Sequence, residues 1–168
     1  QPNQNTNWTS SNSNLPNNLC KFVFEDANGS IYAGLNFEGL WKFNGEDWNI
    51  VDTSSDLNGG GLYAPEVMHR KENELLIGSF NSMAILENEE LKLFDSEKPE
   101  ELEGVQVIRE NSKGELFVGT SGRGITKISS LDYTHYSTNN GVLSSNAIRD
   151  IYLQSDDSLW VVTENVGL

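Results

Sequence analysis

Cysteine and histidine are scarce in this sequence of 168 residues, which contains one cysteine and two histidines. A single cysteine excludes a disulfide framework and a zinc site built from several thiolates. Cys20 lies in the apolar segment "NLCKFVF", where a small buried side chain is expected. His69 and His135 lack the partners that catalysis or metal binding requires, so surface positions are expected for both. The sequence therefore predicts no metal site and no cofactor.

Positive charge and long apolar segments are scarce too. Eleven Lys and Arg residues stand against 25 Asp and Glu residues, which gives a formal net charge of -14. Because binding to nucleic acid needs clustered basic side chains, this balance argues against a nucleic-acid partner. No apolar run approaches the roughly 18 residues that a membrane-spanning helix needs. A ligand that is neutral, cationic or bridged by a metal suits such an acidic protein best.

Sequence patterns of catalysis are absent as well. The chain has neither a Gly-x-Ser-x-Gly nor a His-Glu-x-x-His motif. The acidic segments "ENEE" (87–90) and "SEKPEELE" (96–103) consist mostly of Glu and lack the alternating Asp and Asn of a calcium loop. We interpret both segments as solvated surface. The sequence thus predicts a protein that is not an enzyme.

The sequence does contain an internal repeat of about forty residues. Four similar segments, SIYAGL, ELLIGS, ELFVGT and SLWVVT, begin at spacings of 44, 41 and 43 residues. Their first residues are Ser30, Glu74, Glu115 and Ser158, and their fifth are Gly34, Gly78, Gly119 and Val162. A glycine at the fifth position fits the close approach of neighbouring sheets, where a side chain has no room.

The agreement extends to both sides of these segments at the same offsets. Upstream, one apolar position holds Val23, Val67, Ile108 and Ile151. Each segment follows a turn ending in a residue type that tolerates positive φ, namely Gly29, Asn73, Gly114 or Asp157. Downstream, Gly39, Gly124 and Gly167 share a position at which Met83 is the exception. Agreement at three separate positions indicates a true repeat.

Each repeat unit is predicted to form four short antiparallel strands. In the first unit they cover residues 19–25, 30–35, 40–43 and 48–51, which are rich in β-branched and aromatic residues and bounded by Gly, Asn and Asp. Four such strands in every 40 to 45 residues or so are the signature of a β-propeller blade, and the predicted fold class is all-β. One position of the second strand holds Tyr32, Leu76, Phe117 and Trp160, which are expected to form the core between blades.

Residues near both ends of the chain carry a recognisable pattern. In the last unit it comprises Tyr136, Thr138, Gly141, Leu143, Ser145, Asn146, Ile148, Ile151, Leu159, Trp160, Thr163, Gly167 and Leu168. In the first it comprises Leu15, Pro16, Asn18, Asp26, Gly29, Gly34, Gly39 and Leu40. The pattern resembles the two-component regulator propeller repeat, although Ser158 and Val162 stand where that family has glycine, and the two middle units lack most of its turn.

This resemblance implies a ring of about seven blades. It also implies the ligand-sensing input region of a bacterial two-component sensor, periplasmic or extracellular and often tuned to glycans. In that family an immunoglobulin-like connector, a membrane span and a histidine kinase follow the propeller. Expected partners are therefore the remaining blades and downstream signalling modules of a longer chain, with a homodimer as a further possibility, because ligand binding would shift propeller packing or dimer geometry.

The strand count divides the chain into predicted units. These are a polar N-terminal segment with an isolated outer strand at Trp8 (1–18), three blades (19–53, 54–95 and 96–137) and an incomplete fourth blade (138–168). Two explanations compete for the missing strands. The favoured one is that these residues belong to a larger ring. The other is an arc or four-bladed ring that closes by self-association.

The candidate ligand site lies in the loops that a propeller gathers at one mouth, those after the second strand and between blades. Aromatic, Asn, Glu and Arg side chains there suit stacking and hydrogen bonding to a carbohydrate or small polar ligand. The candidate residues are Asn36, Phe37, Glu38, Tyr63, Phe80, Asn81, Arg123, Asn139, Asn140, Glu164 and Asn165. The favoured function is a non-catalytic sensor of such a ligand. The alternatives are a structural or protein-binding propeller and, less favoured, a propeller lyase or hydrolase.

Overall fold

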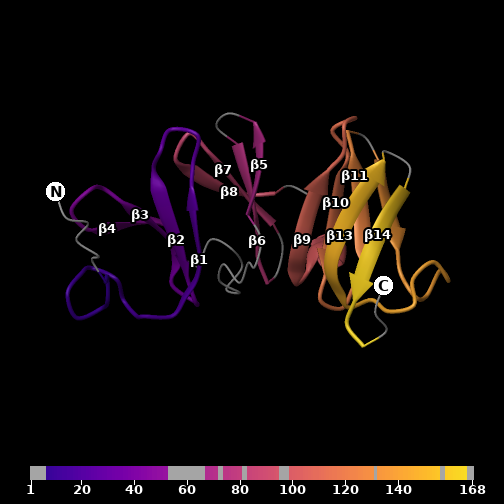
Figure 1. Ribbon diagram of the computed structural model, residues 1–168, viewed down its shortest axis with the longest axis horizontal. Coiled ribbons are helices and arrows are strands. Elements are labelled where there is room, and N and C mark those ends of the chain that lie inside the picture. The colour runs from indigo at the N-terminus through magenta and orange to yellow at the C-terminus, as the bar shows by residue number, and fades with distance from the viewer. Residues whose placement is uncertain are drawn as a thin grey trace.

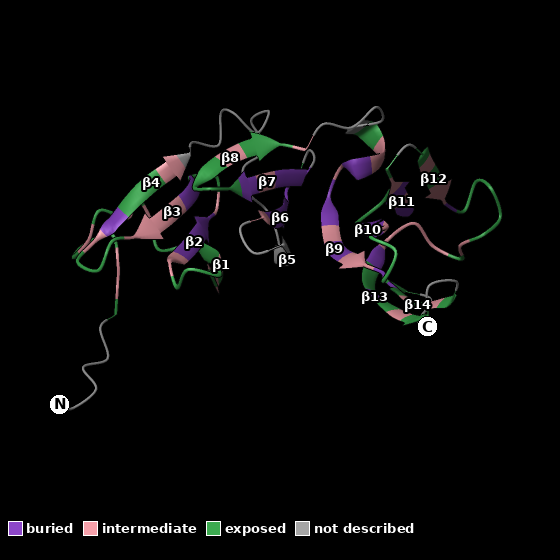
Figure 2. Ribbon diagram, turned by 90° about the horizontal axis from the view of Figure 1, so that it is seen from above, coloured by how far each residue is buried: buried purple, intermediate pink, exposed green. Residues whose placement is uncertain are grey.

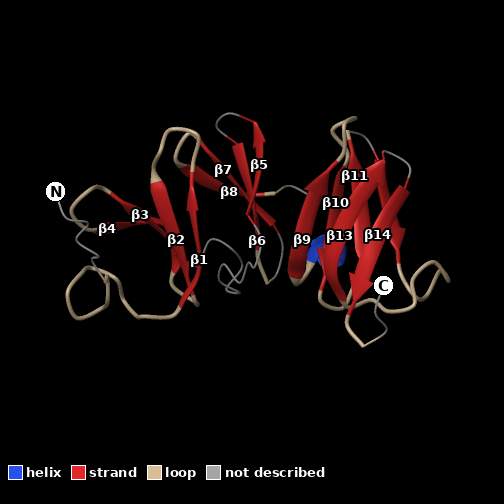
Figure 3. Ribbon diagram, viewed as in Figure 1, coloured by secondary structure: helices blue, strands red, loops and turns tan. Residues whose placement is uncertain are grey.

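A computed structural model describes residues 7–52, 67–71, 74–80, 83–94, 99–130, 132–155 and 158–165. Within these ranges the chain forms fourteen β-strands and one short 3₁₀ helix (Figures 1 and 3). The strands form antiparallel sheets in which each strand pairs with the next one in the chain. The all-β fold class and the propeller-like blades predicted from the repeat are thereby confirmed. None of the described residues belongs to a helix that could cross a membrane.

The sheets follow the repeat units in chain order. The first contains β1 (Cys20–Glu25), β2 (Ile31–Leu35), β3 (Gly39–Phe43) and β4 (Trp48–Asp52). The second contains β5 (Val67–Lys71), β6 (Glu74–Gly78), β7 (Met83–Glu87) and β8 (Glu90–Leu93). The helix η1 (Pro99–Leu102) leads into the third, β9 (Val105–Glu110), β10 (Leu116–Thr120), β11 (Ile125–Ser129) and β12 (Asp132–Tyr136). The fourth contains β13 (Ile148–Ser155) and β14 (Ser158–Thr163). In Figure 2 they stand along a curved row that does not close into a ring.

The core lies between successive sheets rather than within one of them. We call the face that packs on the following sheet the forward face, and the opposite one the rear face. Tyr32, Leu76 and Phe117 are all buried on forward faces and belong to three separate clusters. Each cluster pairs them with aliphatic side chains on the rear face of the next sheet, such as Ile77, Ile108 and Ile151. Alternation along each strand thus gives a sheet two apolar faces, as stacked blades require.

Trp160 departs from its expected place in this core. Its side chain is 52% exposed, although Tyr32 and Leu76 at the equivalent positions are fully buried. It lies with Tyr152 and Val162 on the forward face of the fourth sheet, and all three are exposed. The prediction was wrong for Trp160 because burial at this position depends on a following sheet, and none covers this face within the described residues.

Two repeat glycines explain how closely the sheets pack. A Cβ atom added at Gly78 would lie 2.8 Å from a methyl carbon of Val105 in the third sheet. One added at Gly119 would lie 2.6 Å from Ile148 in the fourth sheet. The expected role of these glycines in the close approach of neighbouring sheets is confirmed. At Gly34 the obstructing group is instead the Phe22 ring of the same sheet.

Strand pairing corrects the alignment of the second repeat. Gly34 pairs with Leu40, and Gly119 pairs with Ile125, but Gly78 pairs with Met83. The loop after β6 is therefore one residue shorter than its counterparts. Met83 takes the buried place of Leu40 and Ile125, and it is not an exception among the loop glycines.

Two expectations near the N-terminus were also wrong. Trp8 lies outside any strand, and its ring packs against Phe43, with 5.2 Å between the ring centroids. Cys20 is exposed rather than buried. Its strand, β1, is at the edge of the first sheet, whose rear face is not covered by another sheet in the described residues; Val23 on that face is 61% exposed.

Candidate ligand-binding groove

The loops in which the site is predicted lie at one end of their sheets. The loop after each second strand bonds to the segment that enters the first strand of a blade. The Asn36 N–H donates to the Leu19 carbonyl at 2.9 Å, and the Glu164 N–H donates to the Ala147 carbonyl at 2.9 Å. This is the geometry that the predicted four-strand topology requires.

A groove opens at this end of the sheets, between the second and third sheets, and we call it the mouth groove. Its volume is about 280 Å³. The residues lining it are Phe80, Glu103, Gly104, Ser121, Gly122 and Arg123. Two of them, Phe80 and Arg123, are candidate site residues predicted from the sequence, and the fold brings them to one groove although they come from different sheets.

Gly104 ties the walls of the groove together. Its N–H donates to the Phe80 carbonyl at 2.6 Å, and its carbonyl accepts from the Ser121 N–H at 2.8 Å. Its φ of 70° lies in the left-handed region that favours glycine. The backbone thereby links the loop after β6, the entry to β9 and the loop after β10.

Replacing Gly104 with alanine should therefore loosen this link. The new Cβ atom would lie 2.4 Å from the Ser121 Oγ, in a backbone conformation that costs a non-glycine residue about 1–2 kcal/mol. We expect the free energy of unfolding, measured by chemical denaturation, to fall by about 2 kcal/mol. Adding Ser121→Ala should restore part of this loss, because it removes the clashing hydroxyl. Equal losses in the single and double variants would contradict this explanation.

Arg123 and Glu103 form an ion pair on the groove wall. The Nε and Nη2 atoms of Arg123 donate to the same carboxylate oxygen, Oε2 of Glu103, at 3.1 and 2.5 Å. The Arg123 N–H donates to the Thr120 Oγ1 at 2.9 Å, and that hydroxyl donates to the Gly124 carbonyl at 3.1 Å. Because Thr120 is fully buried, the backbone that carries the guanidinium is fixed to the core of the third sheet.

The other predicted residues of the first and fourth sheets lie in separate loops. Phe37 has a φ of 61° and is 62% exposed. Asn36 is partly buried, and the Glu38 carbonyl accepts from the Trp41 Nε1 at 2.8 Å. Glu164 accepts from Arg149, whereas Asn165 has a φ of 73° in the same loop. None of the five residues predicted here lines the groove.

Of the remaining predicted residues, the two that the structure describes do not line the groove. Asn140 closes its own turn, since its Oδ1 accepts from the Ser137 N–H at 3.0 Å and its Nδ2 donates to the His135 carbonyl at 2.7 Å. Asn139 is exposed. Tyr63 and Asn81 lie outside the described residues.

Sequence reasoning missed Glu103. It belongs to the acidic segment 96–103, which was interpreted as solvated surface, and its carboxylate is indeed half exposed. Its partner Arg123 is 20 residues away, so no local motif marks the pair. The one usable signal was its place at the entry to a first strand, in the same set of mouth loops as the predicted residues.

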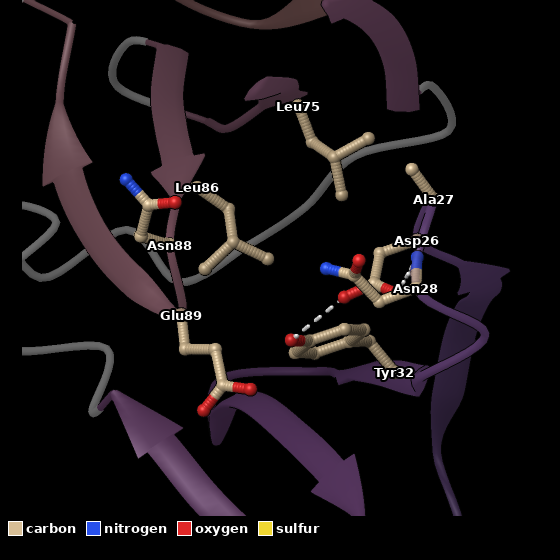
Figure 4. A pocket seen from close by; sticks show the side chains of 8 residues that line it. All are labelled: Asp26, Ala27, Asn28, Tyr32, Leu75, Leu86, Asn88 and Glu89. Carbon is tan, nitrogen blue, oxygen red and sulfur yellow. Dashed lines mark hydrogen bonds between the residues drawn. The ribbon is translucent and has the colours of Figure 1, made fainter. Parts of the chain in front are cut away.

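Two hollows at the opposite end are less suited to a ligand. One, of about 30 Å³, lies between the first two sheets beside Asp26, Tyr32 and Glu89, as Figure 4 shows. It has room for about one water molecule. The Tyr32 hydroxyl donates to the Asp26 Oδ2 at 3.3 Å, and burial raises the pKa of this phenol, as does the neighbouring carboxylate to a lesser extent.

The other hollow is a groove of about 440 Å³ at the hairpins of the third sheet, between Phe94 and Tyr133. Its carboxylate, Glu115, is already satisfied by Lys127 at 2.6 Å and by the Asn111 amide at 2.7 Å. These hydrogen bonds lower the pKa of Glu115 below its ordinary value. This groove is larger, but its carboxylate is committed to partners within the third sheet.

The sequence also led to predictions about metal binding and about the positions of the histidines. No cluster of three His, Cys, Asp or Glu side chains suited to a metal occurs among the residues that the structure describes. His135 is partly buried rather than at the surface, with its Nδ1 atom 3.1 Å from the Thr126 hydroxyl.

Solved structures share this fold. The extracellular domain of BT4673 from B. thetaiotaomicron, described in one structure as a one-component system, superposes with a TM-score of 0.68 at 19% sequence identity. A second structure of the BT4673 extracellular domain, there described as part of a hybrid two-component system, superposes with a TM-score of 0.67, also at 19% identity. In both cases the match covers 86% of this chain and 19% of the other.

A third structure is more distant. The extracellular domain of the hybrid two-component system BT3049, also from B. thetaiotaomicron, has a TM-score of 0.46 at 13% identity, over 89% of this chain and 26% of the other. No protein-family model and no curated protein matches the sequence. The chain thus has the fold of part of the BT4673 extracellular domain and spans about a fifth of the length of that domain.

Proposed function

We propose that this chain is part of the input region of a two-component sensor, located in the periplasm or outside the cell, and that it binds a carbohydrate or small polar ligand without catalysis. The observation that carries the proposal is the mouth groove, where Phe80 and Arg123 meet from adjacent sheets. The shared fold with an extracellular domain of a hybrid two-component system supports the sensing role.

The groove provides the two kinds of contact that a sugar uses. The Phe80 side chain is 55% exposed, so the C–H face of a sugar ring can pack on it. The Glu103 and Arg123 side chains supply acceptors and donors for hydroxyl groups. Aromatic and charged groups placed together in this way are typical of small-ligand sites.

Ligand binding in the mouth groove would favour one conformation of the protein. Phe80 belongs to the loop of the second sheet, and Glu103, Ser121 and Arg123 belong to the third. A ligand that contacts both walls stabilises one relative position of the two sheets. Its differential affinity for that position is the free energy available for a signal.

Titration calorimetry of the chain with a panel of oligosaccharides tests the proposal. We expect at least one of them to bind, and Phe80→Ala to weaken that binding about tenfold, the effect of roughly 1.4 kcal/mol of lost stacking. Tyr152→Ala is the matched control, because it removes an exposed aromatic side chain far from the groove, on the fourth sheet. A panel without any binding, or equal weakening by both variants, would count against the groove as the sensor site.

A further inference from the structure

The charges of the mouth groove neutralise one another but leave hydrogen-bonding atoms available. Both hydrogen bonds that the Arg123 guanidinium donates end on a single oxygen of Glu103, Oε2. In the described part of the chain, the second carboxylate oxygen, Oε1, and the Arg123 Nη1 group have no hydrogen-bond partner. The ion pair thus leaves one acceptor and one two-proton donor available, with no net charge.

On this basis we infer that the ligand is an uncharged sugar, bound through two of its hydroxyl groups. This inference rests on the proposed function and narrows its ligand class. One hydroxyl donates to Oε1 of Glu103, and another accepts from Nη1 of Arg123. The apolar face of the same ring packs on Phe80 across the groove, which has a volume of about 280 Å³.

Charge argues against an acidic sugar at this site. A uronate or sulfate group attracted to Arg123 would approach the Glu103 carboxylate, which already lies within 2.5 Å of that guanidinium. Like charges at such short range repel, and the net charge of -14 on the chain adds to the repulsion at low ionic strength. A neutral hydroxyl pair meets no such penalty and leaves the ion pair intact.

The ion pair is also positioned before any ligand arrives. The Glu103 backbone is next to Gly104, whose two hydrogen bonds fix it to Phe80 and Ser121. The Arg123 N–H is bonded to the buried Thr120 hydroxyl. Because both charged groups extend from fixed backbone, little further ordering is required on binding.

Titration calorimetry with matched neutral and acidic sugars tests this inference. The probes are cellohexaose and mannohexaose as neutral ligands and hexagalacturonate as the acidic one. We expect the unmodified chain to bind a neutral probe at least about tenfold more tightly than the uronate, a difference of roughly 1.4 kcal/mol or more. Phe80→Ala should weaken that binding, which locates it in the groove.

The Glu103→Gln variant tests whether the charge of Glu103 causes the selectivity for neutral sugars. The variant retains one side-chain oxygen to accept from Arg123 and places an amide NH2 where a ligand hydroxyl can accept instead of donate, but it leaves the Arg123 charge uncompensated. We expect affinity for hexagalacturonate to rise about tenfold and affinity for the neutral probe to change less than about threefold. Asp150→Asn is the control, because it changes net charge equally but breaks the Arg109–Asp150 pair, which lies outside the groove. It should change neither affinity beyond about twofold.

The outcomes separate the two proposals. If the unmodified chain prefers hexagalacturonate and Phe80→Ala abolishes that binding, the neutral-sugar inference is overturned and the proposed sensor site stands. If Glu103→Gln and Asp150→Asn raise uronate affinity equally, local charge compensation is overturned as the cause of selectivity. If none of the three probes binds the chain, the inference is overturned as stated, while the wider panel decides the proposed function.

Discussion

Replacing Gly124 with alanine is expected to lower the free energy of unfolding by about 4 kcal/mol, the sum of backbone strain and overpacking. Gly124 has a φ of 102°, a conformation that L side chains rarely adopt. A Cβ atom there would lie 2.2 Å from the Tyr136 carbonyl oxygen. Because this atom belongs to backbone in β12, it has little freedom to move away.

The consequences extend to the mouth of the blade. The Gly124 carbonyl accepts from both the backbone N–H and the hydroxyl of Thr120, and its own N–H donates to the Asn146 carbonyl at 3.0 Å. These bonds hold the loop that carries Arg123, so the substitution should also disturb the groove. Chemical denaturation followed by circular dichroism measures the loss of stability.

Gly122→Ala is the matched control in the same loop. A Cβ atom at Gly122 meets nothing within 4 Å, and its φ lies outside the left-handed region. We expect this variant to change the free energy of unfolding by less than about 0.5 kcal/mol. A similar loss in both variants would mean that the loop tolerates no side chain at all, and that neither the φ of Gly124 nor the Tyr136 carbonyl is the cause.

Phe117→Ala is expected to destabilise the protein by about 4 kcal/mol, within the range for a buried aromatic ring replaced by alanine. Phe117 is 3% exposed and packs with Ile125, Ile148 and Ile151 between the third and fourth sheets. Its removal leaves a cavity whose walls belong to two sheets, so the interface itself weakens.

The repeat supplies the control for this prediction. Trp160 occupies the equivalent position in the fourth sheet but is half exposed, with its Nε1 bonded to the Gln154 side chain at 2.8 Å. Trp160→Ala should cost less than about 1 kcal/mol, since it opens no cavity. Thermal melting of both variants tests this difference. A loss at Trp160 as large as that at Phe117 would show that the forward face of the fourth sheet is covered in solution.

Much of the fold could be predicted because each strand is marked by a local sequence pattern. Alternating apolar residues and turn residues such as Gly29 and Gly114 mark the hairpins, and both glycines have the positive φ that such turns need. The register of the second sheet could not be predicted in this way. A loop one residue shorter moves Met83 into the core, and the sequence offers glycine spacing as the only guide across that loop.

The site was predictable only in part, for a different reason. Phe80 and Arg123 were found because their loops recur at a fixed place in each repeat. Glu103 was missed because its role depends on Arg123, which it meets only after two sheets have packed. The prediction that Trp160 is buried failed because it too depends on packing between sheets. A residue on a sheet face is buried only when another element lies against that face.

Val162 limits how far the repeat units are interchangeable. Where the first three units have glycine at this position, the fourth has a branched side chain on its forward face, 37% exposed. Glycine allows the side chains of the next sheet to approach to within about van der Waals contact of the backbone, whereas an isopropyl group holds them away. A chain assembled from copies of the fourth unit would therefore not reproduce the close approach of sheets seen at Gly78 and Gly119. The repeats share one strand plan, but they are not identical modules.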